Sequence, residues 1–160
     1  MSTSSIRPHG HYVAAVVHGD TVVSAGMTPR SDEKLLAVGR VSAEPDAPGT
    51  IDVPTAARLA GHAVTRALTA CAEALPERAT VLRPLSMTVF VRCAGDFTAH
   101  SAVADGASQV LRERFDTLPA RAAVGVVSLP GGAPVEVQLT MSWKHDRIEA
   151  DGEARAGLGE

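Results

Sequence analysis

Residues 135–143, VEVQLTMSW, alternate without a fault between apolar and polar side chains. Because successive side chains of a strand point to opposite faces, this pattern predicts one long strand with a buried apolar face. The opposite face, with Glu136, Gln138, Thr140 and Ser142, is wholly polar and must meet water or a partner. A solvated face and a face covered by a neighbouring subunit fit this periodicity equally well.

The segments around this strand predict an α+β fold. A long loop is expected between the second strand and the first helix, with a short edge strand at 35–38. The order strand–strand–loop–helix–strand–helix–strand–strand is typical of a sheet with both helices packed on one face. The predicted strands are 12–17, 21–24, 85–91, 121–129 and 135–143, and the predicted helices are 54–75 and 98–115.

Three local signals refine these elements. Asp52 or Val53 is expected to cap the first helix, with Pro54 just inside it, where a missing N–H costs nothing. Gly106 lies within the second helix and weakens it by about 1 kcal/mol relative to alanine. The run 121–129 is apolar at nearly every position, which predicts a strand buried on both faces.

The chain length of 160 residues fits one domain, which we expect over residues 10–144. Residues 1–9 are expected to form a flexible N-terminus, and residues 145–160, which lack an apolar period, a disordered C-terminal tail. Cys71 and Cys93 are too few for a disulfide framework or a metal cluster, so both are interpreted as small buried side chains.

The composition argues against several classes of partner. Fifteen basic and 18 acidic side chains give a net charge of −3, so no nucleic-acid partner is expected. No apolar run approaches the roughly 20 residues that span a bilayer, and the start lacks an apolar signal core, so we expect a cytoplasmic protein without membrane contact. Nucleotide-binding and metal-binding motifs are absent and the histidines are scattered, so neither cofactor nor metal is expected.

Three side chains are candidates for chemistry. Arg121 precedes an apolar strand, where its guanidinium either anchors an anionic substrate or forms a structural salt bridge with Glu136 or with an acid from another chain. Beside a cleft, desolvation would raise the pKa of Glu136 and make it a general base for a water; otherwise it is an exposed strand residue. Tyr12 either donates a hydrogen bond across a cleft or fills the edge of the core.

Several blocks of this sequence resemble the Rid family, the reactive intermediate deaminases that are also called YjgF-like or L-PSP proteins. The blocks stand in the family's order with nearly its spacing and cover about residues 10–143. Each block alone is weak, but together they form a specific signature. They are GHYV at 10–13, VSAGMTP at 23–29, VFVR at 89–92, DF at 96–97, PAR at 119–121, LP at 129–130 and VEV at 135–137.

The resemblance implies a chorismate-mutase-like fold and a homotrimer with three clefts between subunits, each of which binds a small-molecule carboxylate. It implies that Arg121 holds the substrate carboxylate and that Glu136 assists the attacking water. It further implies that Tyr12 lines the cleft and that Gly26 offers backbone groups to the ligand. A neighbouring subunit would then cover the polar strand face.

The sequence also departs from the family pattern. Ala25 stands where many members have serine, with Ser24 one place earlier, and Ala123 replaces a cysteine often found two residues after the arginine. The chain has no asparagine, so the family's asparagine in the second helix is missing, and Ser101 or His100 is nearest to its place. The arginine that would bind the carboxylate is retained while the side chains expected around it differ, which indicates a different substrate or a narrower range of substrates.

The resemblance favours hydrolysis of a small 2-imino or enamino acid to a 2-keto acid and ammonia. Alternatives are a specialised tailoring step on an imine-type intermediate of a biosynthetic pathway, and a non-catalytic trimer that binds small acids. RNA cleavage, another activity attached to the family, is disfavoured by the acidic balance. The favoured assignment expects Arg121 to be unpaired by its own chain at a junction between subunits.

Overall fold

The alternating segment forms β9 (Val135–His145), the central strand of a five-stranded sheet with the order β1-β2-β9-β7-β8. This computed structural model describes residues 6–8, 10–44 and 47–146. Strands β7 and β8 run parallel and the other neighbours are antiparallel, so the sheet is mixed. The remaining strands are β1 (Ala15–His18), β2 (Thr21–Ser24), β7 (Ala79–Arg92) and β8 (Ala120–Val126).

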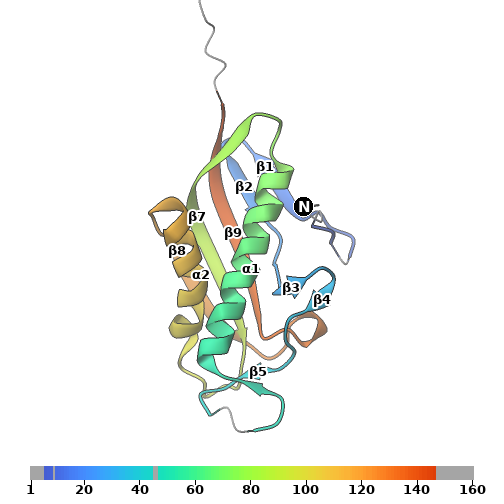
Figure 1. Cartoon of the computed structure of the whole chain (residues 1–160), viewed down its shortest axis with the longest axis vertical. Coiled ribbons are helices and arrows are strands. Elements are labelled where there is room, and N and C mark those ends of the chain that lie inside the picture. Colours follow the sequence, from blue (N-terminus) through green and yellow to red (C-terminus); the bar gives the residue numbers. More distant parts are fainter. Residues whose placement is uncertain (1–5, 9, 45–46, 147–160) are drawn as a thin grey trace, which may run out of the picture.

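Helices α1 (Val53–Ala74) and α2 (His100–Phe115) lie side by side on one face of the sheet, as predicted (Figure 1). The apolar face of β9 packs beneath them, with Val135, Val137 and Leu139 fully buried. The polar face of β9 points away from the helices, and no described element covers it. The α+β architecture expected from the sequence is therefore confirmed.

The predicted cap is confirmed, and Gly106 has a packing role that the sequence does not show. Asp52 caps α1 by accepting a hydrogen bond from the Thr55 amide at 2.6 Å. Gly106 allows α2 to approach α1 closely, because a Cβ at this position would lie 1.9 Å from the Ala57 carbonyl oxygen. The glycine that weakens the isolated helix is thus required at the helix crossing.

The loop before α1 is more ordered than predicted. The expected edge strand at 35–38 is wrong: β3 (Arg30–Ser31) and β4 (Lys34–Leu35) form a separate small hairpin. Asp32 makes this turn possible with a φ of 52°, in the left-handed region that aspartate tolerates better than most residues. Two further short strands, β5 (Arg40–Val41) and β6 (Thr50–Ile51), pair in parallel before the helix.

The prediction of a strand buried on both faces at 121–129 is wrong within one chain. Strand β8 ends at Val126 and forms an edge of the sheet, and none of its residues is buried. Its apolar composition is therefore not explained by packing inside this chain. Strand β1 is also shorter than expected and leaves Tyr12 outside the sheet.

The described structure reaches past the expected end of the domain. Strand β9 includes His145, and the Asp146 amide donates to the Arg78 carbonyl at 2.7 Å. Near the other end, the Ile6 amide donates to the Glu73 carboxylate at 3.0 Å. The rest of the expected flexible ends, 1–5, 9 and 147–160, lies outside the described residues.

Two other features of the described chain bear on the expectations. Cys71 and Cys93 are both free and buried, as interpreted from the sequence. Among the helices of the described ranges, none combines the length and apolar character needed to cross a bilayer.

Candidate functional site

The loop after β2 brings Gly26 against Glu136. Met27 and Val137 exchange two backbone hydrogen bonds of 2.8 and 2.9 Å, which fix the loop to the start of β9. A Cβ on Gly26 would lie only 2.2 Å from Oε1 of Glu136. The carboxylate therefore occupies the space that a side chain at position 26 would need, and the two residues lie directly against each other.

Glu136 is partly buried on the face of β9 turned away from the helices, in register with Phe90 of β7. Burial raises the pKa of this carboxyl, because desolvation disfavours its charged form. No residue in the described ranges donates a hydrogen bond to it. A partly desolvated carboxylate with free lone pairs is suited to accept a proton from a water molecule.

Tyr12 lies near the same loop. This residue is 53% exposed, and with Gly26 it lines a small cavity of about 30 Å³. Gly26 thus borders both the tyrosine and the carboxylate. We call Tyr12, Gly26 and Glu136 the glutamate half-site.

Arg121 occupies a different place in the fold. Its Nη1 donates to Asp105 Oδ1 at 2.7 Å and to Ser108 Oγ at 2.8 Å. Both partners belong to α2, which covers the side of the sheet that Arg121 faces. The expectation that its own chain leaves Arg121 unpaired is therefore wrong, and so is the alternative pairing with Glu136.

Ser101 lies on α2 one turn before Asp105, and residues four apart share a helix face. We call Arg121, Asp105, Ser108 and Ser101 the arginine half-site. His100, the other residue near the missing asparagine, is engaged elsewhere: its Nε2 lies 3.5 Å from the Cys93 sulfur. Ser101 remains exposed at the start of the helix.

The two half-sites lie on opposite faces of the sheet. Arg121 is in register with Met87, whose side chain is buried beneath the helices, whereas Glu136 is in register with Phe90. Three positions along β7 separate these register points, so their side chains point to opposite faces. Strand β7 also separates β8 from β9. One chain alone does not bring Arg121 and Glu136 together.

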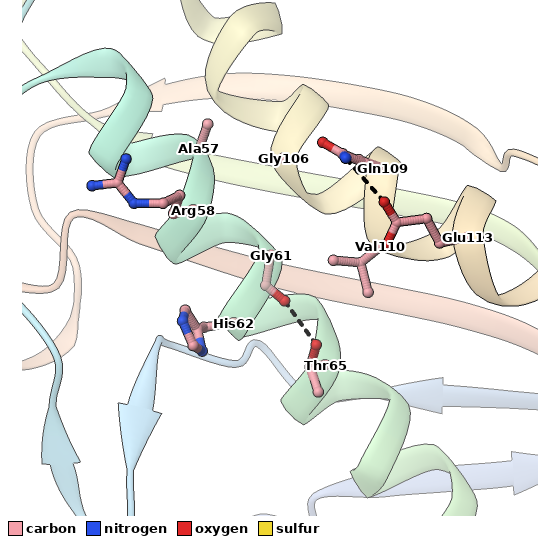
Figure 2. A pocket seen from close by; sticks show the side chains of 9 residues that line it. All are labelled: Ala57, Arg58, Gly61, His62, Thr65, Gly106, Gln109, Val110 and Glu113. Carbon is pink, nitrogen blue, oxygen red and sulfur yellow. Dashed lines mark hydrogen bonds between the residues drawn. The ribbon is translucent and has the colours of Figure 1, made fainter.

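A wider groove runs between the two helices on the outer surface, and Figure 2 shows its lining. Its volume is about 410 Å³. Two hydrogen bonds within the helices, Gln109 to Glu113 and Thr65 to the Gly61 carbonyl, occupy polar groups there. None of the site residues predicted from the sequence lines this groove, so it belongs to neither half-site.

Sequence reasoning missed the partners of Arg121. Asp105 and Ser108 are three residues apart on a predicted helix, so a shared face was readable from the sequence. Their meeting with Arg121 depends on the parallel crossover from α2 into β8, which local patterns do not specify. Within the described ranges, no group of three or more His, Cys, Asp or Glu side chains is arranged to hold a metal ion.

The chain is similar to known proteins over most of its length. The family model described as endoribonuclease L-PSP matches residues 2–142. Protein TCP17 of Trypanosoma cruzi is 31% identical over 137 residues, which cover 84% of this chain and 82% of that protein.

Solved structures show the same fold. Atu1372 of Agrobacterium tumefaciens, of unknown function, is 25% identical with a TM-score of 0.70, over 83% of each chain. The YjgF gene product of E. coli is 21% identical with a TM-score of 0.56, over 84% of this chain and 90% of that one. TdcF of E. coli, solved with bound serine, gives a TM-score of 0.56 at 22% identity, over the same shares.

Proposed function

The chain belongs to the endoribonuclease L-PSP family, and its sequence blocks resemble the reactive intermediate deaminases. We propose that it hydrolyses a small 2-imino or enamino acid to a 2-keto acid and ammonia. The observation that carries the proposal is the Glu136 carboxylate, which is partly desolvated and lies against Gly26 without a hydrogen-bond donor among the described residues. Such a group is suited to activate water beside a small ligand.

In this proposal the site is completed between copies of the chain in a homotrimer. The arginine half-site of one copy would face the glutamate half-site of the next, and the ligand would lie in the cleft between them. The exposed apolar edge strand β8 supports this, as does the polar face of β9 that no described element covers. Contacts between two different surfaces of neighbouring copies produce a closed ring when the rotation between copies closes, and most soluble homo-oligomers are closed in this way.

The reaction needs one water and no external redox partner. Arg121 binds the substrate carboxylate, and Glu136 takes a proton from water while the water oxygen forms a bond to the imine carbon. The protonated imine thereby becomes a carbinolamine, Glu136 returns its proton to the carbinolamine nitrogen, the C–N bond breaks and ammonia leaves. Loss of the hydroxyl proton gives the ketone of the 2-keto acid. The proposal uses no metal, cofactor, nucleic acid or membrane.

The pairing with Asp105 leaves Arg121 able to act. Its hydrogen bonds to described residues all come from Nη1, so Nε and Nη2 retain donors for a carboxylate. The Asp105 side chain is 69% exposed, and an exposed ion pair contributes at most about 1 kcal/mol. A bidentate substrate carboxylate can therefore bind beside Asp105 or replace it.

The direct test is release of ammonia and keto acid from an imine that an amino-acid oxidase generates in the assay. Imines already hydrolyse in water, so orientation and electrostatics need supply only about 10²–10³-fold. We expect the wild type to reach this acceleration, and both Arg121→Ala and Glu136→Gln to lose most of it. Arg83→Ala, which changes an exposed arginine outside both half-sites, should keep it.

Two results would overturn the assignment. A wild-type rate no higher than that of Arg121→Ala would exclude catalysis through this site. Keto-acid binding that Arg121→Ala abolishes, without turnover of any imine, would instead identify a non-catalytic small-acid-binding protein.

A further inference from the structure

The small cavity beside Tyr12 and Gly26 has a concentrated positive charge. Arg7, Arg30 and Arg66 all line it, and none of the described residues that line it is acidic. This is notable in a chain whose net charge is −3. Arg7 belongs to the N-terminal segment, Arg30 begins β3 and Arg66 lies on α1, so the fold rather than sequence proximity gathers them.

The partners of these arginines leave the charge uncompensated. Arg30 donates from Nε to the Thr28 hydroxyl at 3.0 Å and from Nη1 to the backbone carbonyl of Glu33, and both acceptors are neutral. Nε of Arg66 is buried and has no hydrogen-bond partner in the part of the chain that the structure describes. Among the described residues, no carboxylate forms an ion pair with Arg30 or Arg66.

Two guanidinium groups held near one another in this way destabilise each other. Burial and the charge of Arg30 both lower the pKa of Arg66, which places the two groups within electrostatic reach. A desolvated charge without a partner is unfavourable, and an anion between the two groups would relieve both effects. Arg30 and Arg66 both line the cavity, so an anion bound in it would lie against both residues.

We propose that Arg30 and Arg66 form an anion-binding site at this cavity, which takes the carboxylate or phosphate group of a small ligand. The site goes beyond the proposed function, whose carboxylate anchor is Arg121 on the other face of the sheet. It borders the glutamate half-site through Tyr12 and Gly26, so a ligand bound here also reaches that half-site.

The chemistry of the lining fits an oxyanion. Each guanidinium presents planar N–H donors that match carboxylate and phosphate oxygens. The Thr28 hydroxyl accepts from Arg30, which leaves its proton free to donate to an anion. A volume of about 30 Å³ holds a group of a few atoms, so the remainder of a larger ligand must extend outward past exposed Tyr12.

The test is calorimetric titration of the full chain with inorganic phosphate and, separately, with 2-oxobutanoate. Arg66→Met removes the charge and keeps an apolar stem; we expect it to weaken phosphate binding at least tenfold. Arg30→Gln serves as a second variant, with the same expected loss. The exposed control Arg83→Met should leave phosphate affinity within twofold of the wild type.

The two ligands distinguish the sources of the anion. Tighter binding of 2-oxobutanoate than of phosphate, sensitive to Arg66→Met, identifies a substrate carboxylate; the reverse order identifies a phosphate group. Phosphate affinity unchanged in both Arg66→Met and Arg30→Gln, or lost only in Arg121→Ala, would overturn the proposal.

A stability measurement shows whether the variants are folded. Without added anion, Arg66→Met should melt at or above the wild-type temperature, since it removes an unpaired, partly buried charge. The result is also separable from the proposed function, because imine turnover is measured independently and depends on Glu136.

Discussion

Asp105 Oδ1 lies 2.7 Å from Nη1 of Arg121, on the side of the sheet that the helices cover. The Arg121 side chain is 23% exposed and that of Asp105 is 69% exposed, so within this ion pair Asp105 is the residue in contact with solvent. A carboxylate of the chain itself therefore occupies one edge of the guanidinium that the family pattern assigns to a substrate. Asp105 is a built-in competitor for that ligand.

Removing this competitor should strengthen ligand binding. We expect Asp105→Asn to bind 2-oxobutanoate up to about fivefold more tightly, because the exposed pair it breaks contributes no more than about 1 kcal/mol. Titration calorimetry measures the change, with Glu77→Gln as a control for the loss of one exposed acid. Weaker binding in Asp105→Asn would mean instead that Asp105 orients Arg121 for its ligand.

The contact between Gly26 and Glu136 predicts the effect of one added methyl group. Alanine at position 26 would place its Cβ 2.2 Å from Oε1 of Glu136, so the carboxylate must move. We expect Gly26→Ala to lower imine turnover at least tenfold and the free energy of unfolding by roughly 1–3 kcal/mol. Gly95→Ala is the matched control, because a Cβ there meets no atom within 4 Å. Equal effects of both substitutions would contradict this account.

Glu136 also predicts a pH dependence. Its pKa is raised above the ordinary value of 4.5 by desolvation, so the folded state holds its proton to higher pH than the unfolded state. Between about pH 4.5 and the pKa of Glu136 in the folded state, the unfolded state binds fewer protons than the folded state, so the free energy of unfolding falls as pH rises. Above the folded-state pKa both states are ionised, and the free energy of unfolding falls no further from this group. Turnover should rise over the same window, since the ionised form accepts the proton.

Glu136→Gln separates these two consequences. The variant should show no turnover at any pH. Its free energy of unfolding, measured with denaturant between pH 4 and 8, should fall less with rising pH than that of the wild type. A decline of the same size in Glu136→Gln would assign it to other groups.

The sequence predicted those features that are written in local periodicity. The alternation in β9 and the cap at Asp52 depend on neighbouring residues, and both are confirmed. The prediction that the apolar run in β8 is buried on both faces within the chain is wrong, because composition does not tell whether the surface that covers a strand belongs to the same chain. Where an apolar strand forms a sheet edge, the covering partner must be sought outside the chain.

The contacts within the candidate site also depend on tertiary structure, which local sequence patterns do not specify. The resemblance implied separate ligand roles for Gly26 and Glu136, and the contact between the two is a finding of the structure. The pairing of Arg121 with Asp105 joins residues 16 positions apart across a parallel crossover. Arg30 of β3 and Arg66 of α1 are far apart in the sequence and line one cavity only in the folded chain. Neither arrangement leaves a periodic trace in the sequence.

The crossing of the two helices gives a last prediction in which two effects oppose each other. Alanine at position 106 raises the intrinsic helix propensity of α2 by about 1 kcal/mol. Its Cβ, however, would lie 1.9 Å from the carbonyl oxygen of Ala57, and backbone atoms yield less readily than a flexible side chain. Overpacking typically costs about 1–3 kcal/mol, and the rigidity of this contact places it at the upper end.

We therefore expect Gly106→Ala to lower the free energy of unfolding by about 1–2 kcal/mol, even though alanine is the better helix former. Thermal unfolding should register a fall of several degrees, against no more than a small change for the unobstructed Gly95→Ala. A melting temperature above that of the wild type would show that the two helices can move apart without a loss of stability, and that their close approach does not require glycine at position 106.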